Sequence, residues 1–221
     1  MAKKIPYGLT DYFRIVTEDF YYVDKTKYIE DLEKTAAFLF LIRPRRFGKS
    51  LFLNMLNCYY DVKYADRFEE LFGNQYIGNH PTAEQGKYLV LRFNFSMVRA
   101  TDDKLEAAFN RHISLETAYF ASVYASYFKP DFQEQLKLIP EAAGRLEYIC
   151  LCAKEQGLSI YLLIDEYDNF TNTILSSKGN DVYHSLTHDS GFYRSFFNVV
   201  KGVTTGAEAP VKRMFITGVS P

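Results

Sequence analysis

The tripeptide Gly48-Lys49-Ser50 has the residue types, in the right order, that bind the phosphate groups of a nucleotide. A glycine lets backbone N–H groups come close to phosphate oxygens, and a lysine reaches the β- and γ-phosphate oxygens. The serine hydroxyl is a ligand for Mg²⁺, and a helix that begins here directs partial positive charge at the anion. We therefore predict a phosphate-binding loop, with Lys49 acting on the phosphates and Ser50 on the metal.

The loop before this tripeptide departs from the usual phosphate-loop pattern, because Arg43 stands where the first glycine is expected. Pro44 has no N–H and a fixed φ, so the loop should start stiffly and Arg43 should continue the preceding strand. Arg45 and Arg46 add charge, either for contact with phosphate or for pairing with acids elsewhere. The residues predicted to bind the nucleotide are Arg43, Pro44, Arg45, Arg46, Phe47, Gly48, Lys49, Ser50 and Leu51.

A pair of acids follows the apolar run from Ile160 to Ile164 and completes the predicted site. Asp165 is placed to hold Mg²⁺, mainly through a water, and Glu166 to polarise the attacking water. Both acids leave the carboxyl end of a strand, where ligands bind in open α/β sheets. The pattern predicts Ser50 and Asp165 as the metal ligands. Asp168, two residues later, is either a further acid of the site or a helix cap.

Thr217 ends another apolar run, which begins at Met214, and is a third candidate for the reaction. A polar residue at the end of such a strand is placed to sense the γ-phosphate. The competing interpretation is an ordinary turn-forming threonine. The predicted catalytic residues are Glu166, Lys49 and Thr217.

Strands that alternate with helices have to position these residues. The uninterrupted run at 36–42 is typical of a strand buried on both faces, as in a parallel sheet. Polar, glycine-containing residues 172–191 favour a loop. Such an alternation predicts an α/β fold with a mostly parallel sheet covered by helices. Further strands are predicted at 88–95, 160–164 and 214–217, and helices near 28–32, 49–60, 103–127, 140–157 and 192–203.

The composition excludes several classes of protein. The chain has 221 residues with a formal charge of −1, which argues against a polybasic nucleic-acid coat. With 48% hydrophobic and 24% charged residues it is not a disordered chain. The longest clean apolar run, 36–42, is far too short to span a membrane, and no signal peptide is visible. Three cysteines without a CxxC spacing predict free thiols and a cytoplasmic location.

Two other patterns have a chemical and a structural interpretation. His184 and His188 have metal-ligand spacing if they are helical, but solvated histidines are favoured because the region predicts a loop. The aromatic stretch at 119–127 either stacks on bases or packs in the interior, and its helical spacing favours packing.

In these motifs the sequence resembles the AAA-ATPase-like P-loop proteins of bacteria. Its arginine-rich loop is very specific for that group, so the missing first glycine is a family trait. The motifs fall in the expected order and span nearly the whole chain. They are Tyr22-Val23-Asp24-Lys25-Thr26, Arg43-Pro44-Arg45-Arg46-Phe47-Gly48-Lys49-Ser50, Leu163-Ile164-Asp165-Glu166-Tyr167-Asp168 and Thr217-Gly218-Val219-Ser220-Pro221.

The resemblance implies a three-layer P-loop NTPase fold of the ASCE type. In that fold a further strand lies between the two Walker strands, which here are the strand before the phosphate loop and the strand before Asp165. The segment 88–95 is the candidate for that strand. Family members commonly carry a C-terminal PD-(D/E)XK nuclease-like domain. We therefore interpret the chain either as the N-terminal ATPase part of such a protein or as a natural truncation, in both cases without the last strand of the sheet and the lid. Residues 1–35 form a segment that packs on the core, and residues 36–221 form the core.

The expected function is that of a cytoplasmic ATPase domain that binds ATP and Mg²⁺ and hydrolyses ATP by water attack on the γ-phosphate. ATP is preferred to GTP by resemblance, and Asp24-Lys25-Thr26 lies either near the adenine or at a helix cap. The alternative is a nucleotide-gated switch with little turnover, which regulates an attached or separate nuclease-like effector. In that case the domain would contact nucleic acid only indirectly, through the effector, and no membrane would be involved. A third possibility is a degenerate scaffold that binds a protein and no nucleotide.

Overall fold

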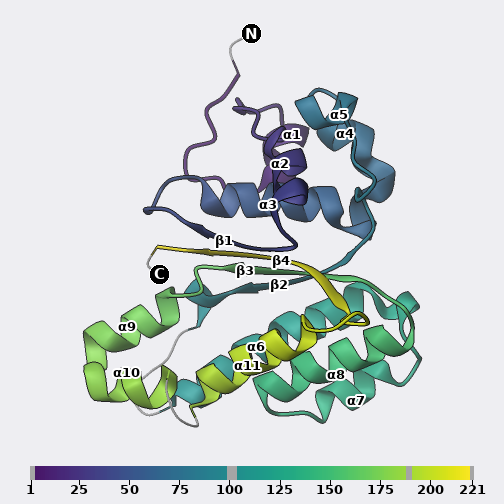
Figure 1. Ribbon diagram of the computed structural model, residues 1–221. Helices are drawn as coiled ribbons and strands as arrows, with labels where there is room; N and C mark the ends of the chain where they lie inside the picture. The colour runs from purple at the N-terminus through teal and green to yellow at the C-terminus, as the bar shows by residue number, and fades with distance from the viewer. Residues whose placement is uncertain (1–2, 99–103, 188–190, 220–221) are drawn as a thin grey trace.

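A computed structural model describes residues 3–98, 104–187 and 191–219 of the chain. Its centre is a sheet of four parallel strands in the order β1-β4-β3-β2, with helices on both faces (Figure 1). This arrangement is a three-layer α/β fold of the P-loop NTPase type and confirms the predicted fold class. The strands are β1 (Phe38–Ile42), β2 (Leu89–Asn94), β3 (Ile160–Asp165) and β4 (Val211–Gly218).

The helices form the two outer layers. On one face lie α1 (Tyr12–Thr17), α2 (Tyr28–Thr35), α3 (Lys49–Tyr60), α4 (Phe68–Phe72) and α5 (Tyr76–Asn79) (Figure 1). On the other lie α6 (Leu105–Val123), α7 (Phe132–Lys137), α8 (Ala142–Glu155) and α11 (Phe192–Val203). Two more helices, α9 (Asn169–Lys178) and α10 (Asn180–Thr187), follow β3, and short 3-10 turns are η1 (Val62–Arg67), η2 (Phe95–Met97) and η3 (Ala125–Tyr127).

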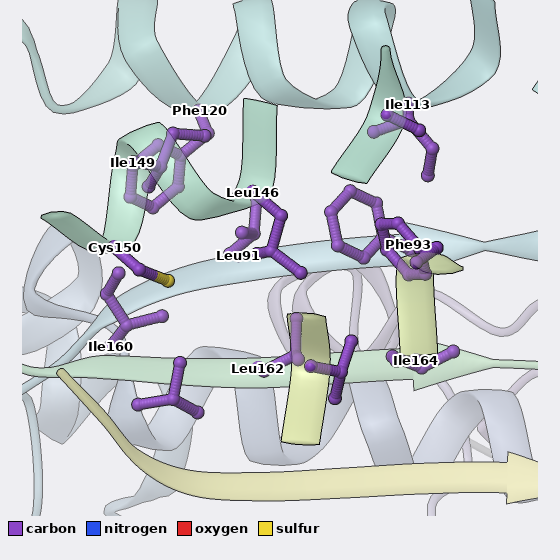
Figure 2. Packing of buried hydrophobic residues seen from close by; sticks show 14 of the residues in the cluster. Leu91, Phe93, Ile113, Phe120, Leu146, Ile149, Cys150, Ile160, Leu162 and Ile164 are labelled. Carbon is purple, nitrogen blue, oxygen red and sulfur yellow. The ribbon is translucent and has the colours of Figure 1, made fainter. Parts of the chain in front are cut away.

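Alternate residues of neighbouring strands build the larger of two cores. Leu91 and Phe93 of β2, with Leu162 and Ile164 of β3, are fully buried and face α6 and α8 (Figure 2). Val90 of β2, with Tyr161 and Leu163 of β3, faces the other way and packs in a second cluster with side chains of α1 and α3–α5. Because both faces of β3 are covered, its sequence is apolar from Ile160 to Ile164. The paired cores hold the carboxyl ends of the strands in register.

The first strand differs from the prediction. It begins at Phe38 and lies at an edge of the sheet, where it pairs only with β4 among the described strands. The side chain of Phe38 is 41% exposed and that of Phe40 is 57% exposed. The expectation of a strand buried on both faces is therefore wrong. Apolar residues without alternation indicated burial, but the sequence does not show which strands form the edges.

The strand order also corrects the place given to segment 88–95. That segment forms β2, at the edge opposite β1, and not the strand between the two Walker strands. The strand in that place is β4, which pairs with β1 on one side and β3 on the other. As a consequence, Thr217 near the end of β4 lies between the phosphate loop and the acids of β3.

The predicted loop at 172–191 is also corrected, because α9 and α10 occupy most of it. Phe170, Ile174 and Leu186 are buried and give these helices an inner face. Many of the remaining residues are serines and threonines that donate to carbonyls in the preceding turn, as Thr173 does to Asn169 at 2.8 Å. Such back-bonding lets polar residues sit in a helix despite their weak propensity.

The candidate metal pair lies in this corrected region. His184 is exposed on α10, and His188 lies outside the described residues. Within residues 3–98, 104–187 and 191–219, no group of histidine, cysteine and acidic side chains has the arrangement of a metal site. The cysteines Cys58, Cys150 and Cys152 are free thiols. No described helix is both long and apolar enough to cross a membrane.

Acidification is expected to destabilise the fold through His112 of α6. The imidazole is buried, its Nε2 has no hydrogen-bond partner among the residues that the structure describes, and burial lowers its pKa below the ordinary value of 6.5. The unfolded chain therefore binds a proton at a pH where the folded protein does not. The free energy of unfolding should then fall as the pH drops below 6.5, through the pKa of the folded state.

Urea denaturation at about pH 7.5 and about pH 5.5 tests this expectation. Wild type should lose more stability between the two than His112→Leu, which carries no titrating group at this position. Equal losses in the two proteins would show that His112 does not contribute to acid sensitivity.

Candidate nucleotide-binding site

The predicted phosphate loop connects β1 to α3 at the carboxyl edge of the sheet. Arg46 and Gly48 have left-handed backbone, with φ of 65° and 80°. A Cβ on Gly48 would meet no atom within 4 Å, so the glycine is favoured there by its conformation and not by space. Gly48 is also the N-cap of α3, which places the first N–H groups of that helix at the loop.

Lys49 lies across this loop. Its Nζ donates to the carbonyl oxygens of Arg43 and Pro44, at 2.9 and 3.0 Å, and the side chain is buried. The N–H of Arg43 donates to the carbonyl of Gly218 at 3.2 Å, which attaches the loop to β4. The lysine thus holds the loop together, while the side chains of Arg45 and Phe47 remain exposed.

Asp165 ends β3 and is 1% exposed. The hydroxyl of Thr217 donates to its Oδ1 at 2.5 Å, which fixes the carboxylate from the neighbouring strand. Its Oδ2 accepts no hydrogen bond from the residues that the structure describes. Thr217 is completely buried. The predicted metal acid and the predicted sensor are therefore direct partners.

Glu166 is held in a strained backbone conformation next to this pair. Its φ of 51° is unusual for a residue other than glycine. Its N–H lies 3.4 Å from the Thr217 hydroxyl, and the next N–H, that of Tyr167, donates to the Thr217 carbonyl at 3.0 Å. Strain of this kind persists where surrounding contacts enforce it, and such positions concentrate at functional sites.

A small cavity of about 150 Å³ joins the phosphate loop to the acids. Arg45 lines it from the loop and Glu166 from the end of β3, so the fold brings two predicted segments more than a hundred residues apart to one place. Its other lining residues are Asp168, Asn169, Asn172, Thr173, Ser176 and Val219.

Asp168 has a contact that sequence reasoning did not find. Both of its carboxylate oxygens accept from the N–H of Val219, at 3.2 and 3.1 Å, and Asn172 donates to one of them at 3.1 Å. It stands at the N-cap of α9 without making a side-chain cap bond there. The carboxylate therefore ties the end of β4 to the turn after β3. Of the two earlier interpretations, the helix cap is confirmed in position, since Asp168 is the N-cap residue of α9, and a metal role stays a prediction.

Gly218 is needed for close approach at the same point. A Cβ on this residue would lie 2.4 Å from Cε1 of Tyr167 and 2.9 Å from an oxygen of Asp168. The sequence signal for this constraint is the Thr217-Gly218 pair, which ends a strand directly opposite the acids.

An apolar groove of about 740 Å³ adjoins the loop on its other side. Its exposed aromatic surface could not be predicted from the sequence, because its walls come from four separate segments. Lys25 lines the groove, whereas Asp24 turns away and accepts from the N–H of Tyr76 at 2.7 Å. Asp24 therefore does not cap α2, whose N-cap is Lys27. The groove is lined by Pro6, Tyr21, Tyr22, Val23, Lys25, Tyr28, Leu32, Leu39, Phe40, Leu41, Arg43, Phe47, Gly48, Lys49, Leu51, Phe52 and Phe215.

The sheet order, the glycine-capped loop and the acidic strand end together define a protein of the P-loop nucleotide-binding class. Comparison with known proteins agrees, since the chain belongs to the AAA-ATPase-like family, described as "Predicted AAA-ATPase", whose model matches residues 6–221. The family assignment expected from the motifs is thereby confirmed.

One curated relative is similar over a short stretch. The uncharacterized protein in the vnfD 5' region of Azotobacter chroococcum mcd 1 is 49% identical over 55 residues. The match covers 24% of this chain and 11% of the relative, so most of that protein lies outside the alignment. No solved structure matches the chain.

Proposed function

We propose that this chain binds ATP with Mg²⁺ and hydrolyses ATP by attack of water on the γ-phosphate. The observation that carries the proposal is the cavity shared by Arg45 and Glu166, beside the buried Asp165. The guanidinium of Arg45, from the phosphate loop, and the carboxylate of Glu166 then line the same cavity. Positioning and charge neutralisation supply most of the catalysis in this kind of reaction.

The phosphates are proposed to bind along residues 43–51. The first N–H groups of α3 and the ammonium of Lys49 offer donors, and the exposed Arg45 and Arg46 add charge at the mouth. A bound phosphate would compete with the carbonyls of Arg43 and Pro44 for the Lys49 ammonium. The charged oxygens are the stronger acceptors, so the lysine moves to them.

The residues at the metal position fit Mg²⁺. Asp165 keeps Oδ2 free of described donors, and Ser50 stands in the first turn of α3 with its hydroxyl as the second oxygen ligand. Oxygen ligands of this kind suit Mg²⁺, which keeps several waters in nucleotide sites. When bound, the ion would supply neutralisation of the phosphate charge. Thr217 orients Asp165 for that contact, and Glu166 polarises the water.

The apolar groove is proposed to hold the base. Its exposed aromatic rings Tyr21, Phe40 and Phe47 lie next to Gly48 and Lys49, within reach of a base whose phosphates occupy the loop. Stacking of a base on such rings contributes roughly 1–3 kcal/mol. The preference for ATP over GTP rests on the family resemblance.

Calorimetric titration with ATP, with and without Mg²⁺, tests the proposal. Saturable binding that strengthens with Mg²⁺ is expected. Negligible binding under both conditions would leave the family scaffold without nucleotide and overturn the proposed function.

A second candidate function is a nucleotide-gated switch with little turnover. Lys49 is already satisfied by loop carbonyls, so the loop has a closed arrangement that nucleotide would have to open. In this form the domain would regulate a nuclease-like effector, attached or separate, in the bacterial cytoplasm, and would meet nucleic acid only through it. Steady-state phosphate release separates the two: fast release favours the enzyme, and tight binding without release favours the switch.

The division into two parts is also a proposal. Residues 1–35 would act as a segment packed on the core of residues 36–221. Tyr12 of α1 and Ile29 of α2 are fully buried in one cluster with Leu53 of α3, which supports tight attachment of that segment. The hydroxyl of Tyr12 also donates to the carbonyl of Leu71 at 2.9 Å.

Thr217→Val is expected to lower turnover by about tenfold or more, because it removes the donor to Asp165 while keeping the side-chain volume. Thr217→Ser keeps the hydroxyl and should retain most of the activity. Phosphate-release assays on the two variants, with thermal unfolding as a check on folding, make the comparison. Equal activity of Thr217→Val and wild type would show that this hydrogen bond is dispensable.

A further inference from the structure

A second, polar cavity lies at the β2 edge of the sheet, and no residue of the phosphate loop lines it. Its volume is about 660 Å³, within the range of small-molecule sites. None of its lining residues lines the apolar groove or the small cavity at Glu166. It is bounded by the start of α1, the second half of α3, η1, β2 and α6, through Asp11, Phe13, Asn54, Asn57, Cys58, Asp61, Lys63, Tyr64, Arg67, Val90, Arg92, Asn94, Met97, Glu116, Tyr119, Phe120, Val123 and Tyr124.

Two opposite charges face this polar cavity without meeting. The guanidinium of Arg92 donates to Oδ1 of Asn54 at 2.9 Å and forms no ion pair with the described residues. The half-buried carboxylate of Glu116 has no hydrogen-bond donor among them. Burial raises the pKa of Glu116, and the charge of Arg92 opposes that rise. The two groups therefore interact electrostatically across the cavity, and each keeps unused hydrogen-bonding capacity.

Arg92 is also held in place. Asn54 donates from Nδ2 to the carbonyl of Ser50 at 2.9 Å, so its amide oxygen is directed at the guanidinium. This contact uses Nη1 and leaves the other guanidinium donors for a ligand. A preorganised donor of this kind reduces the entropy lost on binding.

Aromatic rings and a cation line the rest of the polar cavity. Tyr64, the largely exposed Tyr119 and, on the α1 side, Phe13 line it, with the Lys63 ammonium over both tyrosine rings and the Arg67 guanidinium over Phe13. The ammonium of Lys63 is 4.6 Å from the ring centroid of Tyr64 and 3.9 Å from a carboxylate oxygen of Asp61. Flat heteroaromatic rings stack on such side chains, and a loosely paired lysine attracts phosphate.

We propose that the polar cavity binds a free guanine nucleotide. Guanine offers the acceptors O6 and N7 to a guanidinium, and the donors N1–H and N2–H to a carboxylate. Arg92 and Glu116 are that pair. Adenine has no N1–H and puts an N–H donor where Arg92 requires an acceptor. A mononucleotide is favoured over a nucleic-acid strand, because the chain has a net charge of −1 and the cavity has the volume of a small ligand.

Calorimetric titration of the full chain with GMP and with AMP tests the proposal. GMP lacks the β- and γ-phosphates that Lys49 is proposed to bind, so it reports mainly on the polar cavity. We expect saturable binding of GMP with a stoichiometry near one, and an affinity for AMP at least about tenfold lower. Equal affinities for the two, or no binding of GMP, would overturn the proposal.

Variants separate this cavity from the phosphate loop. Glu116→Gln should weaken GMP binding about tenfold or more, whereas Glu134→Gln, at an exposed position on α7, should not change it. Lys49→Ala should also leave GMP affinity unchanged, so the result does not depend on ATP binding at the loop. Loss of GMP binding in Lys49→Ala with retention in Glu116→Gln would place GMP at the loop and contradict the proposal.

A short single-stranded oligonucleotide that ends in guanine tests whether the cavity takes its guanine from a nucleic-acid strand and not from a free nucleotide. It should bind more weakly than GMP, because the cavity accepts one nucleotide and the surrounding chain carries no excess of positive charge. Tighter binding of the oligonucleotide than of GMP would contradict the assignment to a free nucleotide.

Discussion

Replacement of Glu166 by glutamine is expected to lower the rate of ATP hydrolysis by roughly 10²–10⁴-fold, the contribution of a positioned general base. Glutamine keeps the size of the side chain and much of its hydrogen bonding, but it cannot polarise the attacking water as a carboxylate does. ATP affinity should persist, or rise slightly, because a negative charge near the γ-phosphate is removed. Single-turnover phosphate release and calorimetry measure the two quantities separately.

Asp165→Asn is the matched comparison. It removes one charge from a buried carboxylate that Thr217 already orients, so the Mg²⁺-dependent part of ATP affinity should fall. Glu166→Gln should lose rate without losing ATP binding, whereas Asp165→Asn should lose metal-dependent binding. This difference separates the role of Glu166 from that of Asp165. If Glu166→Gln weakens ATP binding as much as Asp165→Asn and leaves the rate per bound ATP unchanged, the assigned roles are wrong.

The phosphate loop and the acidic strand end could be predicted from sequence because each is a local pattern. Gly48 and Lys49 mark a strand-to-helix turn, and apolar residues before Asp165 mark a strand end. The order of the strands is not local. It depends on which strands pair across the chain, and so the sequence did not reveal that β1 is an edge or that β4 lies between β1 and β3.

The apolar groove and the polar cavity could not be predicted from the sequence for a similar reason. Lys25 and Phe47 line the same groove, and Arg92 and Glu116 line the same cavity, only because separate segments come together. Nothing in the neighbours of Arg92 along the chain distinguishes it from a surface arginine. The helices α9 and α10 were missed because their polar residues resemble a loop, although buried apolar side chains recur along them.

Lys49→Ala is expected to lower ATP affinity by about 10²-fold or more, or about 2.7 kcal/mol. In the described structure the ammonium donates to two carbonyls of the loop, and in the proposed complex it donates to phosphate oxygens. Charge-assisted bonds to phosphate are the stronger of the two, so the exchange favours binding. Alanine provides neither, and calorimetry with ATP and Mg²⁺ should show the loss directly.

The contacts of Lys49 with the carbonyls of Arg43 and Pro44 require a control, because they also stabilise the phosphate loop itself. Lys154→Ala removes a lysine from the exposed surface of α8, where it pairs with Glu208, and should leave ATP affinity unchanged. Lys49→Arg retains a cation but cannot place a compact ammonium between two carbonyls, so its affinity should lie between wild type and Lys49→Ala. Thermal unfolding identifies any variant that loses the fold. ATP binding to folded Lys49→Ala at wild-type affinity would show that the loop does not bind phosphate through this lysine.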